Sequence, residues 1–273
     1  MSEPAAKAAP AEPVLLREDE GGVATLTLNR PKQRNSLSED LMRALTAELA
    51  AIADDKSVRA VVLAGAGPAF CAGHDLKELT AARASDDRGR AFFQKTMQLC
   101  GTLMQAVVNC PKPVIARVHG IATAAGCQLV ASCDLAVAAE DAKFATPGVN
   151  IGLFCSTPMV ALSRNVTRKH AMEMLLTGEM ISAARAAEFG LVNRVVPQAE
   201  LDAAVAHFAD VIASKSALTV SIGKRAFYEQ LEKPLAEAYD YASEVMVRNM
   251  LARDAEEGIG AFIEKRDPKW EDR

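Results

Sequence analysis

The sequence predicts an α/β fold up to about residue 196 and a helical region after it. Short apolar segments typical of strands alternate with segments of helical periodicity, a pattern that favours right-handed β-α-β connections. From Pro197 onward the pattern is helical almost throughout. We therefore predict a disordered N-terminal arm (1–13), an α/β core (14–196) and a helical subdomain (197–273) that makes oligomer contacts.

The first predicted strand lies in "GVATLTLNRP", where apolar and polar residues alternate until Pro31 ends the pattern. The next segment, "SLSEDLMRALTAELAAIADD", has helical periodicity, and Ser36 and Glu39 have the spacing of a capping box. Its apolar side chains fall on one face, namely Leu41, Leu45, Leu49 and Ile52. This part of the chain therefore predicts a strand followed by an amphipathic helix.

Four further strands are predicted along the chain. The segment "RAVVLAGAG" is short and apolar on both faces, which is typical of a sheet covered on two sides. The others are "PKPVIARVHG", which begins near Pro113, then "DLAVAAE", and finally "VNRVVP" after the helical segment "SAARAAEFG". The C-terminal helices are predicted in "AELDAAVAHFADVIASK", "LTVSIGKRAFYEQL" and "LAEAYDYASEVMVRNMLARD".

Composition narrows the class of protein. The chain has 273 residues, half of them hydrophobic, and a net charge of −4, so no basic face for bulk nucleic-acid binding is expected. We also expect no membrane partner, because no apolar run has the length of a membrane span. Residues 1–13 lack the apolar core of a signal peptide and the arginine-rich character of a transit peptide. A cytoplasmic location is therefore expected.

The cysteines and histidines predict neither disulfides nor a metal site. The six cysteines form no C-x-x-C pair and lie mostly in apolar surroundings, which is typical of buried free thiols in a reducing compartment. Only four histidines are present, and none has the spacing of metal ligands. We therefore expect no metal and no redox cofactor.

Two strand-to-helix turns resemble each other. One contains Ala72, Gly73 and His74, and the other contains Ala124, Ala125 and Gly126. Each leaves backbone N–H groups free at the end of a strand, with the positive end of a helix dipole behind them. Two such donors aimed at one point form an oxyanion hole, although small residues at a tight crossing would give the same pattern.

Six segments, in order, carry a resemblance to the enoyl-CoA hydratase/isomerase, or crotonase, family. They are "NRPKQRNSL", "FCAGHDLKEL", "VIARVHGIATAAGCQLVASCDLAVA", "KFATPGVNIGL", "LLTGEMISAARAAEFGLVNRVVP" and "GIGAFIEKRDPKW". The resemblance runs from about Val14 to Trp270. It implies a crotonase-type spiral of ββα units with a C-terminal helical trimerisation subdomain, assembled as a homotrimer or a dimer of trimers.

The resemblance also implies a ligand and site residues. The ligand is an acyl-CoA thioester, with coenzyme A entering as part of the substrate and no separate cofactor. The backbone N–H groups of His74 and Ala125 would form the oxyanion hole. Contacts to coenzyme A carry over to Lys32, Gln33, Arg34, Ala72, Asp75 and Lys77. At the adenine end the resemblance implies Phe262 and Lys265, with a neighbouring subunit as one possible source of these two residues. The basic residues suit phosphate groups, although each has the alternative of an ordinary surface charge.

This chain departs from the family at both acid-base positions. Hydratases of the family resemble "GGGCE" followed by "F-G-x-P-E", whose two glutamates flank the water that adds to the double bond. Gln128 and Gly148 stand at these positions here. General acid-base groups contribute roughly 10²- to 10⁴-fold each, so hydration is expected to be feeble. Among the candidates to replace these glutamates, Cys127 and Cys155 are better interpreted as inert thiols. Asp134 is equally consistent with a structural or a catalytic role.

Three hypotheses stay open. The first is a crotonase-family enzyme, a hydratase or isomerase by resemblance, with unconventional acid-base residues. The second is a malonyl-type CoA decarboxylase that needs only the oxyanion hole. It is favoured by the G-H-D-L tetrad, which resembles that of methylmalonyl-CoA decarboxylases, but those carry a tyrosine where this chain has "LFCST". The third is a non-catalytic acyl-CoA-binding pseudoenzyme.

Overall fold

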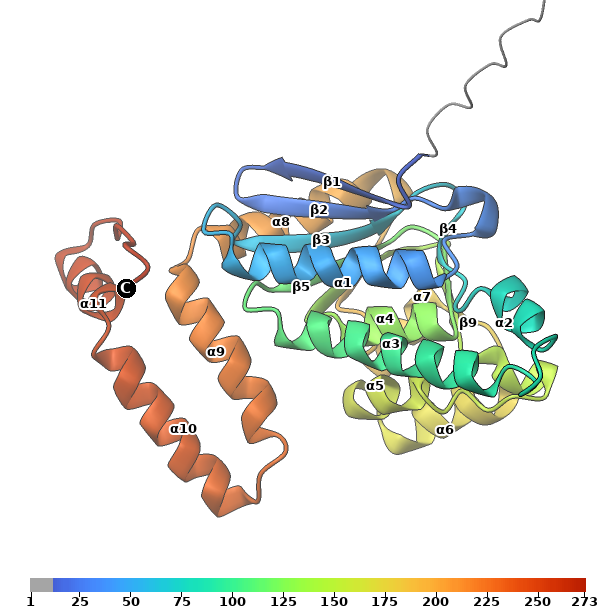
Figure 1. Ribbon diagram of the computed structural model, residues 1–273. Coiled ribbons are helices and arrows are strands. Elements are labelled where there is room, and N and C mark those ends of the chain that lie inside the picture. The colour runs from blue at the N-terminus through green and yellow to red at the C-terminus, as the bar shows by residue number, and fades with distance from the viewer. Residues whose placement is uncertain (1–11) are drawn as a thin grey trace, which may run out of the picture.

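The computed structural model describes residues 12–273, so almost all of the predicted arm at 1–13 lies outside the described residues. Figure 1 shows a layered α/β body with a helical arm beside it. Its strands are β1 (Leu15–Glu20), β2 (Val23–Leu28), β3 (Ala60–Gly65), β4 (Ala69–Cys71), β5 (Val114–Val118), β6 (Ile121–Thr123), β7 (Leu135–Ala139), β8 (Lys143–Ala145), β9 (Ile181–Ser182) and β10 (Arg194–Val196). Its helices are α1 (Glu39–Asp54), α2 (Leu76–Ala82), α3 (Arg90–Asn109), α4 (Ala125–Ser132), α5 (Pro158–Asn165), α6 (Arg168–Thr177), α7 (Ala183–Phe189), α8 (Leu201–Ala213), α9 (Ala217–Gln230), α10 (Leu235–Met250) and α11 (Arg253–Glu264). Three short 3-10 helices are η1 (Pro31–Gln33), η2 (Pro147–Ile151) and η3 (Gln198–Glu200).

The larger sheet contains the five predicted strands. Its order is β1-β2-β3-β5-β7-β10, and all neighbours are parallel except the antiparallel pair β1 and β2. Parallel neighbours need long crossover connections, which the intervening helices supply. The pattern missed β1, because this edge strand, "LLREDE", has no alternation of apolar and polar residues.

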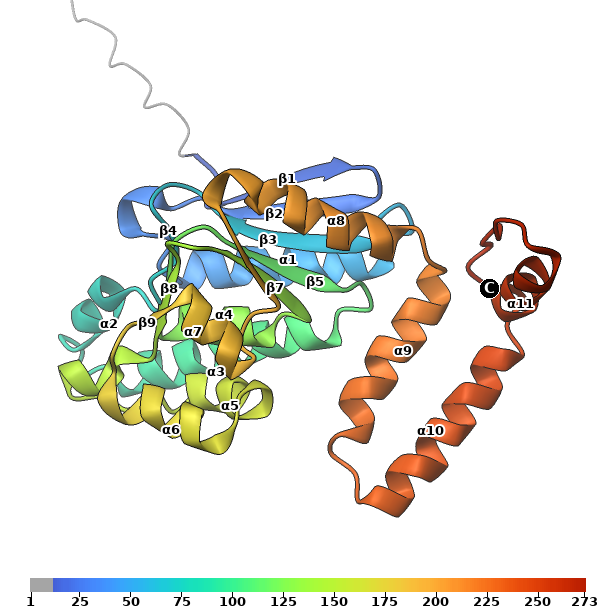
Figure 2. The same ribbon diagram turned by 180° about the vertical axis from the view of Figure 1, so that it is seen from behind.

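Helices cover both faces of the larger sheet. On one face Val61 and Leu63 of β3 join the cluster that includes Leu41 and other apolar residues of α1 and α3. On the other face Val62 packs with Leu201 and further apolar residues of α8. Figures 1 and 2 show α1 and α8 on opposite sides. The double coverage explains why β3 is apolar on both faces and confirms that prediction.

A second, smaller sheet generates the spiral. Its order is β4-β6-β8-β9, and β3, β5 and β7 each lead directly into β4, β6 and β8. Each such strand pair therefore adds one strand to each sheet before the next helix. This arrangement confirms the ββα spiral that the family resemblance implies. The pattern missed these strands because they have only two or three residues, too few to show periodicity by themselves.

The start of α1 differs from its prediction. The residue that caps the helix is Ser38, whose hydroxyl accepts a hydrogen bond from the N–H of Leu41 at 3.3 Å. The capping box predicted from Ser36 and Glu39 is therefore wrong. Ser36 lies three residues before the first residue of the helix, and its hydroxyl donates to the Asp75 carboxylate at 3.3 Å.

The last three helices form an arm that projects from the body. Figures 1 and 2 both show α10 and α11 separated from the sheets, with α9 between them and the body. Helix α8 lies in the predicted helical subdomain yet packs on the sheet, and the boundary at residue 197 stays a prediction. Among residues 12–273 no single helix is long and apolar enough to cross a membrane. The segment 198–213, which comprises η3 and α8, passes the test of length and composition only together with α9, and these two segments are bent by 105° relative to each other.

Several contacts fasten the arm to the body, and the first set centres on Asp134. The Lys224 ammonium on α9 donates to the Asp134 carboxylate at 2.6 Å and to the carbonyls of Val107 and Lys112 at 3.2 Å each. The hydroxyl of Tyr228 donates to the other Asp134 oxygen at 2.9 Å. This arrangement gives Asp134 a structural role.

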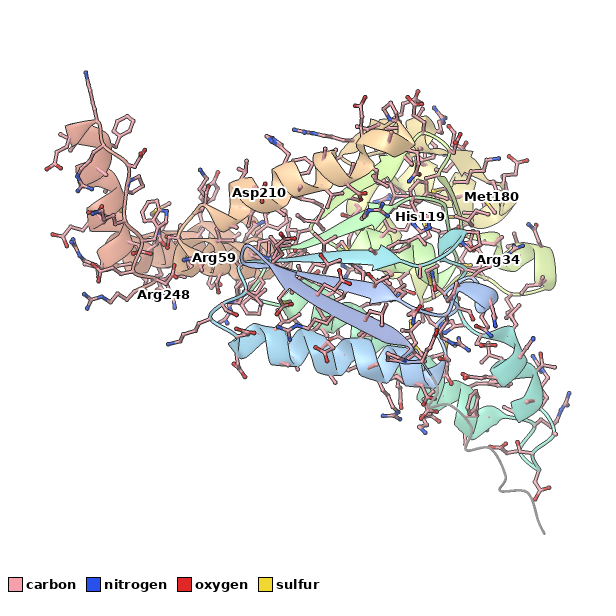
Figure 3. The ribbon with its side chains drawn as sticks, turned by 90° about the horizontal axis from the view of Figure 1, so that it is seen from above. Arg34, Arg59, His119, Met180, Asp210 and Arg248 are labelled. Atoms are coloured by element: carbon pink, nitrogen blue, oxygen red, sulfur yellow. The ribbon has the colours of Figure 1, made fainter. Side chains whose placement is uncertain are left out.

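The second set lies at the C-terminal end of the chain. Arg59, labelled in Figure 3 where the body meets the arm, pairs with Asp272 at 2.9 Å. The indole N–H of Trp270 donates to the carbonyl of Ser214 at 2.9 Å. The residues after α11 therefore fold back onto the junction between α8 and α9.

Candidate active site

The two predicted turns lie against each other. A Cβ added to Gly73 would lie 2.9 Å from the Cβ of Ala124 and 3.4 Å from the nitrogen of Ala125. The hydroxyl of Thr123 donates to the carbonyl of Ala72 at 3.2 Å, which ties the two turns together. Because β4 and β6 are parallel neighbours, the turns that follow them meet at the same edge of the smaller sheet.

Both candidate oxyanion donors are free of protein acceptors. Ala125 is the first residue of α4, so its N–H has no partner within the helix. His74 lies beside Leu37 in an isolated bridge, whose hydrogen bonds use the N–H groups of Leu37 and Asp75. Within 12–273 neither the His74 nor the Ala125 N–H donates to a carbonyl or side chain. The structure thus leaves two unused donors on adjoining turns.

Gly126 allows this close approach. A Cβ on Gly126 would lie 2.1 Å from the carbonyl oxygen of Cys71 and 2.7 Å from its carbonyl carbon. Real Cβ atoms do not approach a backbone so closely, so only glycine lets α4 begin directly against β4. The small residues in this stretch therefore serve close backbone packing, and that packing also positions the donor N–H of Ala125.

His74 is half-buried, and the two nitrogen atoms of its ring are buried. Neither its Nδ1 nor its Nε2 has a partner in the described chain. Burial lowers the pKa of His74, because the charged imidazolium would lose its solvation. The ring is consequently neutral at pH 7 and supplies no positive charge to the site. The backbone N–H is then the part of His74 that fits the predicted role.

The segment with the predicted coenzyme A contacts is held rigidly beside these turns. Asn35, which is fully buried, accepts from the N–H of Arg30 and donates to the carbonyls of Ala66 and Ala69. The carbonyl of Arg34 accepts from the N–H of Ala72 at 3.0 Å. The "PKQRN" and "AGHDLK" segments are therefore adjacent, as a shared ligand requires. Arg30 and Asn35 lie in the segment "NRPKQRNSL", but the sequence analysis assigned neither residue a role.

Asp75 is engaged within the protein. Its carboxylate accepts from Arg30 at 2.9 Å and from the N–H of Lys77 at 3.0 Å, and it caps α2. Burial raises the pKa of Asp75, but these hydrogen bonds outweigh burial and the net pKa is lowered. Asp75 therefore holds the turn in place as an ionised group, and its direct contact with coenzyme A stays a prediction.

Three exposed cations surround the same turns. Lys32, Arg34 and Lys77 are exposed, and none of them forms an ion pair within the described chain. Gln33 is exposed beside them. Figure 3 labels Arg34 at the end of the body opposite to the arm. These side chains are free to meet the phosphates of a ligand.

Gln128 lies one turn along α4 from Ala125. Its side chain is buried, and its Oε1 is 3.7 Å from the sulfur of Cys100, which donates to it. The residue also lines a cavity of about 1050 Å³ between α3, α4, α5 and α9. An amide at this position donates and accepts hydrogen bonds but does not exchange a proton with substrate.

The space at Gly148 is closed to a side chain. A Cβ there would lie 2.7 Å from the carbonyl oxygen of Leu153 and 2.9 Å from the sulfur of Cys155. The N–H of Gly148 donates to that sulfur at 3.3 Å. The loop with Leu153 and Cys155 thus fills the place next to the second glutamate position. The pattern could not show this, because the loop is five to seven residues further along the chain.

The two cysteines near the site have the properties of inert thiols. Burial raises the pKa of Cys127 to about 12, and burial also raises the pKa of Cys155. A thiol that stays protonated at pH 7 is a poor nucleophile. In the described part of the chain no three His, Cys, Asp or Glu side chains are grouped so that they would hold a metal ion.

Phe262 and Lys265 lie far from the turns within one chain. They belong to the end of α11, which Figure 1 shows on the side opposite to α2. The Phe262 side chain is 85% exposed. The structure does not bring these two residues to the site in a single chain, and their contact with coenzyme A from a neighbouring subunit stays a prediction.

The fold and the two free donors define a protein of the crotonase type, and comparisons with known proteins agree. The family model described as enoyl-CoA hydratase/isomerase matches residues 18–273. The chain belongs to this family. The human enoyl-CoA hydratase domain-containing protein 3, mitochondrial, is 49% identical over 249 residues, which cover 91% of this chain and 80% of that protein.

Solved structures show the same likeness. The crystal structure of an enoyl-CoA hydratase from Mycobacterium smegmatis is 54% identical, with a TM-score of 0.91, and the match covers 95% of this chain and 99% of that one. The crystal structure of human enoyl Coenzyme A hydratase domain-containing protein 3 is 47% identical, with a TM-score of 0.90 over 94% of this chain and all of that one.

The expected cytoplasmic location is contradicted by these relatives. The human relative and its rat counterpart, which is 47% identical, are both named as mitochondrial proteins. The expectation rested on the composition of residues 1–13, which lie mostly outside the described range. The composition of a short N-terminal stretch was therefore a poor guide to location.

Proposed function

We propose that this protein binds an acyl-CoA thioester and stabilises the enolate form of its acyl group. The thioester oxygen would accept hydrogen bonds from the backbone N–H groups of His74 and Ala125. One observation carries the proposal: these donors lie on adjoining turns and have no acceptor within the described chain. An oxyanion that gains charge between two fixed N–H groups is stabilised without reorganisation of the site.

The exposed cations support coenzyme A as the carrier of the acyl group. Lys32, Arg34 and Lys77 lie on the two segments that the Arg34–Ala72 hydrogen bond joins. Charge-assisted hydrogen bonds from lysine and arginine are the ordinary means of holding phosphates. The donors would thus hold the thioester while the cations hold the phosphates of the same ligand.

The residues at both acid-base positions disfavour conventional hydration. Gln128 is an amide, and Gly148 is packed against the Cys155 loop. A malonyl-type decarboxylation is the second candidate, because it needs an oxyanion hole and no carboxylate base. An acyl-CoA-binding protein without turnover is the third, and it shares the binding half of the site.

Activity assays distinguish these candidates. We expect feeble turnover of crotonyl-CoA and of a 3-enoyl-CoA, and calorimetric binding of a saturated acyl-CoA. Turnover of methylmalonyl-CoA would select the decarboxylase, and binding without turnover of any of the three would select the non-catalytic protein. Robust hydration of crotonyl-CoA that survives Gln128→Ala would contradict the proposed loss of acid-base chemistry.

Replacing Ala125 by proline tests the oxyanion hole. Proline is tolerated at the first position of a helix and lacks the N–H that the thioester would use, but it also restricts the backbone of the preceding residue, Ala124. We expect Ala125→Pro to lower any turnover by about 10²- to 10³-fold, and to abolish the preference for butyryl-CoA over its thioether analogue in calorimetry. Circular dichroism would establish that the variant is folded, and a folded variant that keeps the preference would exclude Ala125 as a donor.

Introducing the missing glutamate at residue 148 is expected to fail. The new Cβ of Gly148→Glu must displace the Leu153 carbonyl and the Cys155 sulfur, at a cost of about 1–3 kcal/mol in unfolding free energy. We expect lower thermal stability and no gain in crotonyl-CoA hydration, alone or with Gln128→Glu. The matched control is Gln128→Glu by itself. A stable double variant that hydrates crotonyl-CoA well would show that the Cys155 loop yields easily.

We further propose that the arm mediates assembly as a homotrimer or a dimer of trimers. Large apolar side chains are exposed along α9 to α11, including Leu231, Leu235, Tyr239, Met246, Val247, Met250, Leu251, Phe262 and Ile263. Exposed apolar surface of this extent is typical of protein contacts. A second copy on this surface would also offer Phe262 and Lys265 a neighbouring site. Light scattering that finds a monomer would contradict assembly.

A further inference from the structure

The residue before the Ala125 donor has an unfavourable backbone conformation. Ala124 has φ 50° and ψ −119°, the angles of the first central residue of a type II′ turn. That position favours glycine, because a Cβ collides with the neighbouring carbonyl when φ is positive. The three glycines of "GGGCE" in the family's hydratases include this position, whereas the present chain has alanine at 124 and 125.

The surrounding structure holds Ala124 in this conformation from both sides. Its N–H donates to the carbonyl of Ala145 on β8 at 2.9 Å. Its carbonyl accepts from the N–H of Gln128 at 3.0 Å and so begins the hydrogen-bond ladder of α4. Rotation of the Ala124–Ala125 peptide would relieve the strain but would break the Gln128 hydrogen bond. The peptide orientation that exposes the Ala125 N–H is therefore fixed.

The Ala124 methyl group also fills the gap between the two donor turns. Gly73 lies so close that its own Cβ would be 2.9 Å from the Cβ of Ala124. Gly73 has φ +93° and leads directly to His74, the other donor. The methyl group of Ala124 therefore lies against the turn that carries the His74 N–H. The carbonyl carbon of Ala124 is bonded to the nitrogen of Ala125, which is the other donor.

We propose that Ala124 is a positioning residue, whose methyl group against Gly73 sets the separation of the His74 and Ala125 N–H groups. This inference rests on the proposed oxyanion hole. It identifies the contact that keeps the two donor N–H groups at a fixed separation. Strain of this kind persists where the rest of the fold over-determines the conformation, and it gathers at functional sites. Without the methyl group, the two turns are free to shift relative to each other.

The test is Ala124→Gly in the full-length protein. Relief of the strain is expected to raise the Tm by about 2–4 °C. The affinity for butyryl-CoA is expected to fall about tenfold, the ratio that corresponds to one hydrogen bond of about 1.4 kcal/mol. The affinity for coenzyme A itself should fall less, because free coenzyme A has no thioester oxygen to meet the two N–H groups. Differential scanning calorimetry and titration calorimetry provide the two measurements.

Ala131→Gly is the matched control, because Ala131 lies within α4 and glycine there should lower the Tm. If Ala124→Gly lowers the Tm by as much as Ala131→Gly, no strain is stored and the inference is overturned. A raised Tm with unchanged butyryl-CoA affinity also overturns it. If the unmodified protein binds butyryl-CoA no better than its thioether analogue, the oxyanion hole itself fails. A thioester preference that survives Ala124→Gly overturns only the role of Ala124.

Discussion

Replacing Gly126 by alanine is expected to destabilise the protein by about 3 kcal/mol or more in unfolding free energy. The added Cβ would lie 2.1 Å from the Cys71 carbonyl oxygen, and the obstacle is backbone rather than a flexible side chain. Either β4 or the start of α4 must move to relieve this clash. Thioester binding is expected to be lost with it, because Ala125 is the first residue of that helix.

Gly101→Ala is the control for Gly126→Ala. Gly101 lies inside α3, and a Cβ there meets nothing within 4 Å. Alanine should stabilise this helix by up to about 1 kcal/mol, since glycine is the poorer helix former. Urea denaturation of both variants measures the difference. If Gly126→Ala proves as stable as Gly101→Ala, the close packing of α4 on β4 is not required.

The second large effect is expected from Lys224→Met. Lys224 is almost fully buried, and its removal leaves the Asp134 carboxylate without its charged partner. Breaking a buried ion pair costs about 3–5 kcal/mol, and we expect about 3 because the Tyr228 hydroxyl and the Val114 N–H still donate to Asp134. The arm should loosen as well, since α9 is fastened at this point.

The double variant Lys224→Met with Asp134→Asn distinguishes charge from packing. Asparagine carries no charge to leave uncompensated, so the double variant should recover part of the lost stability. Denaturation measures stability, and proteolysis at the junction of α8 and α9 measures the freedom of the arm. If Lys224→Met and the double variant lose the same free energy of unfolding, the loss comes from packing of the lysine side chain and not from the ion pair.

Much of the fold was predictable from the sequence. The five strands of the larger sheet followed from short apolar segments set between helical ones, and the helical character after Pro197 followed from long segments of helical periodicity. The short strands did not follow, and neither did the cap of α1. Ser36 and Ser38 both have a hydroxyl that could cap α1. In the structure the Ser36 hydroxyl donates to Asp75, and the Ser38 hydroxyl caps the helix.

The candidate site was predictable in part for the same reason. The turns at Gly73 and Ala125 were visible as small residues after strands, and the absence of carboxylates at 128 and 148 was visible directly. Arg30 and Asn35 escaped notice because their roles depend on partners 31 to 45 residues away. No local pattern records contacts across such separations.

The sequence by itself determined the family of this protein and the chemical groups its site possesses and lacks. Only the tertiary structure decided that the His74 and Ala125 N–H groups adjoin without other acceptors, that Cys155 closes the space at Gly148, and that Ala124 is strained. The physical reason is that the identity of a group is local, whereas its freedom to bind depends on what the rest of the chain packs against it.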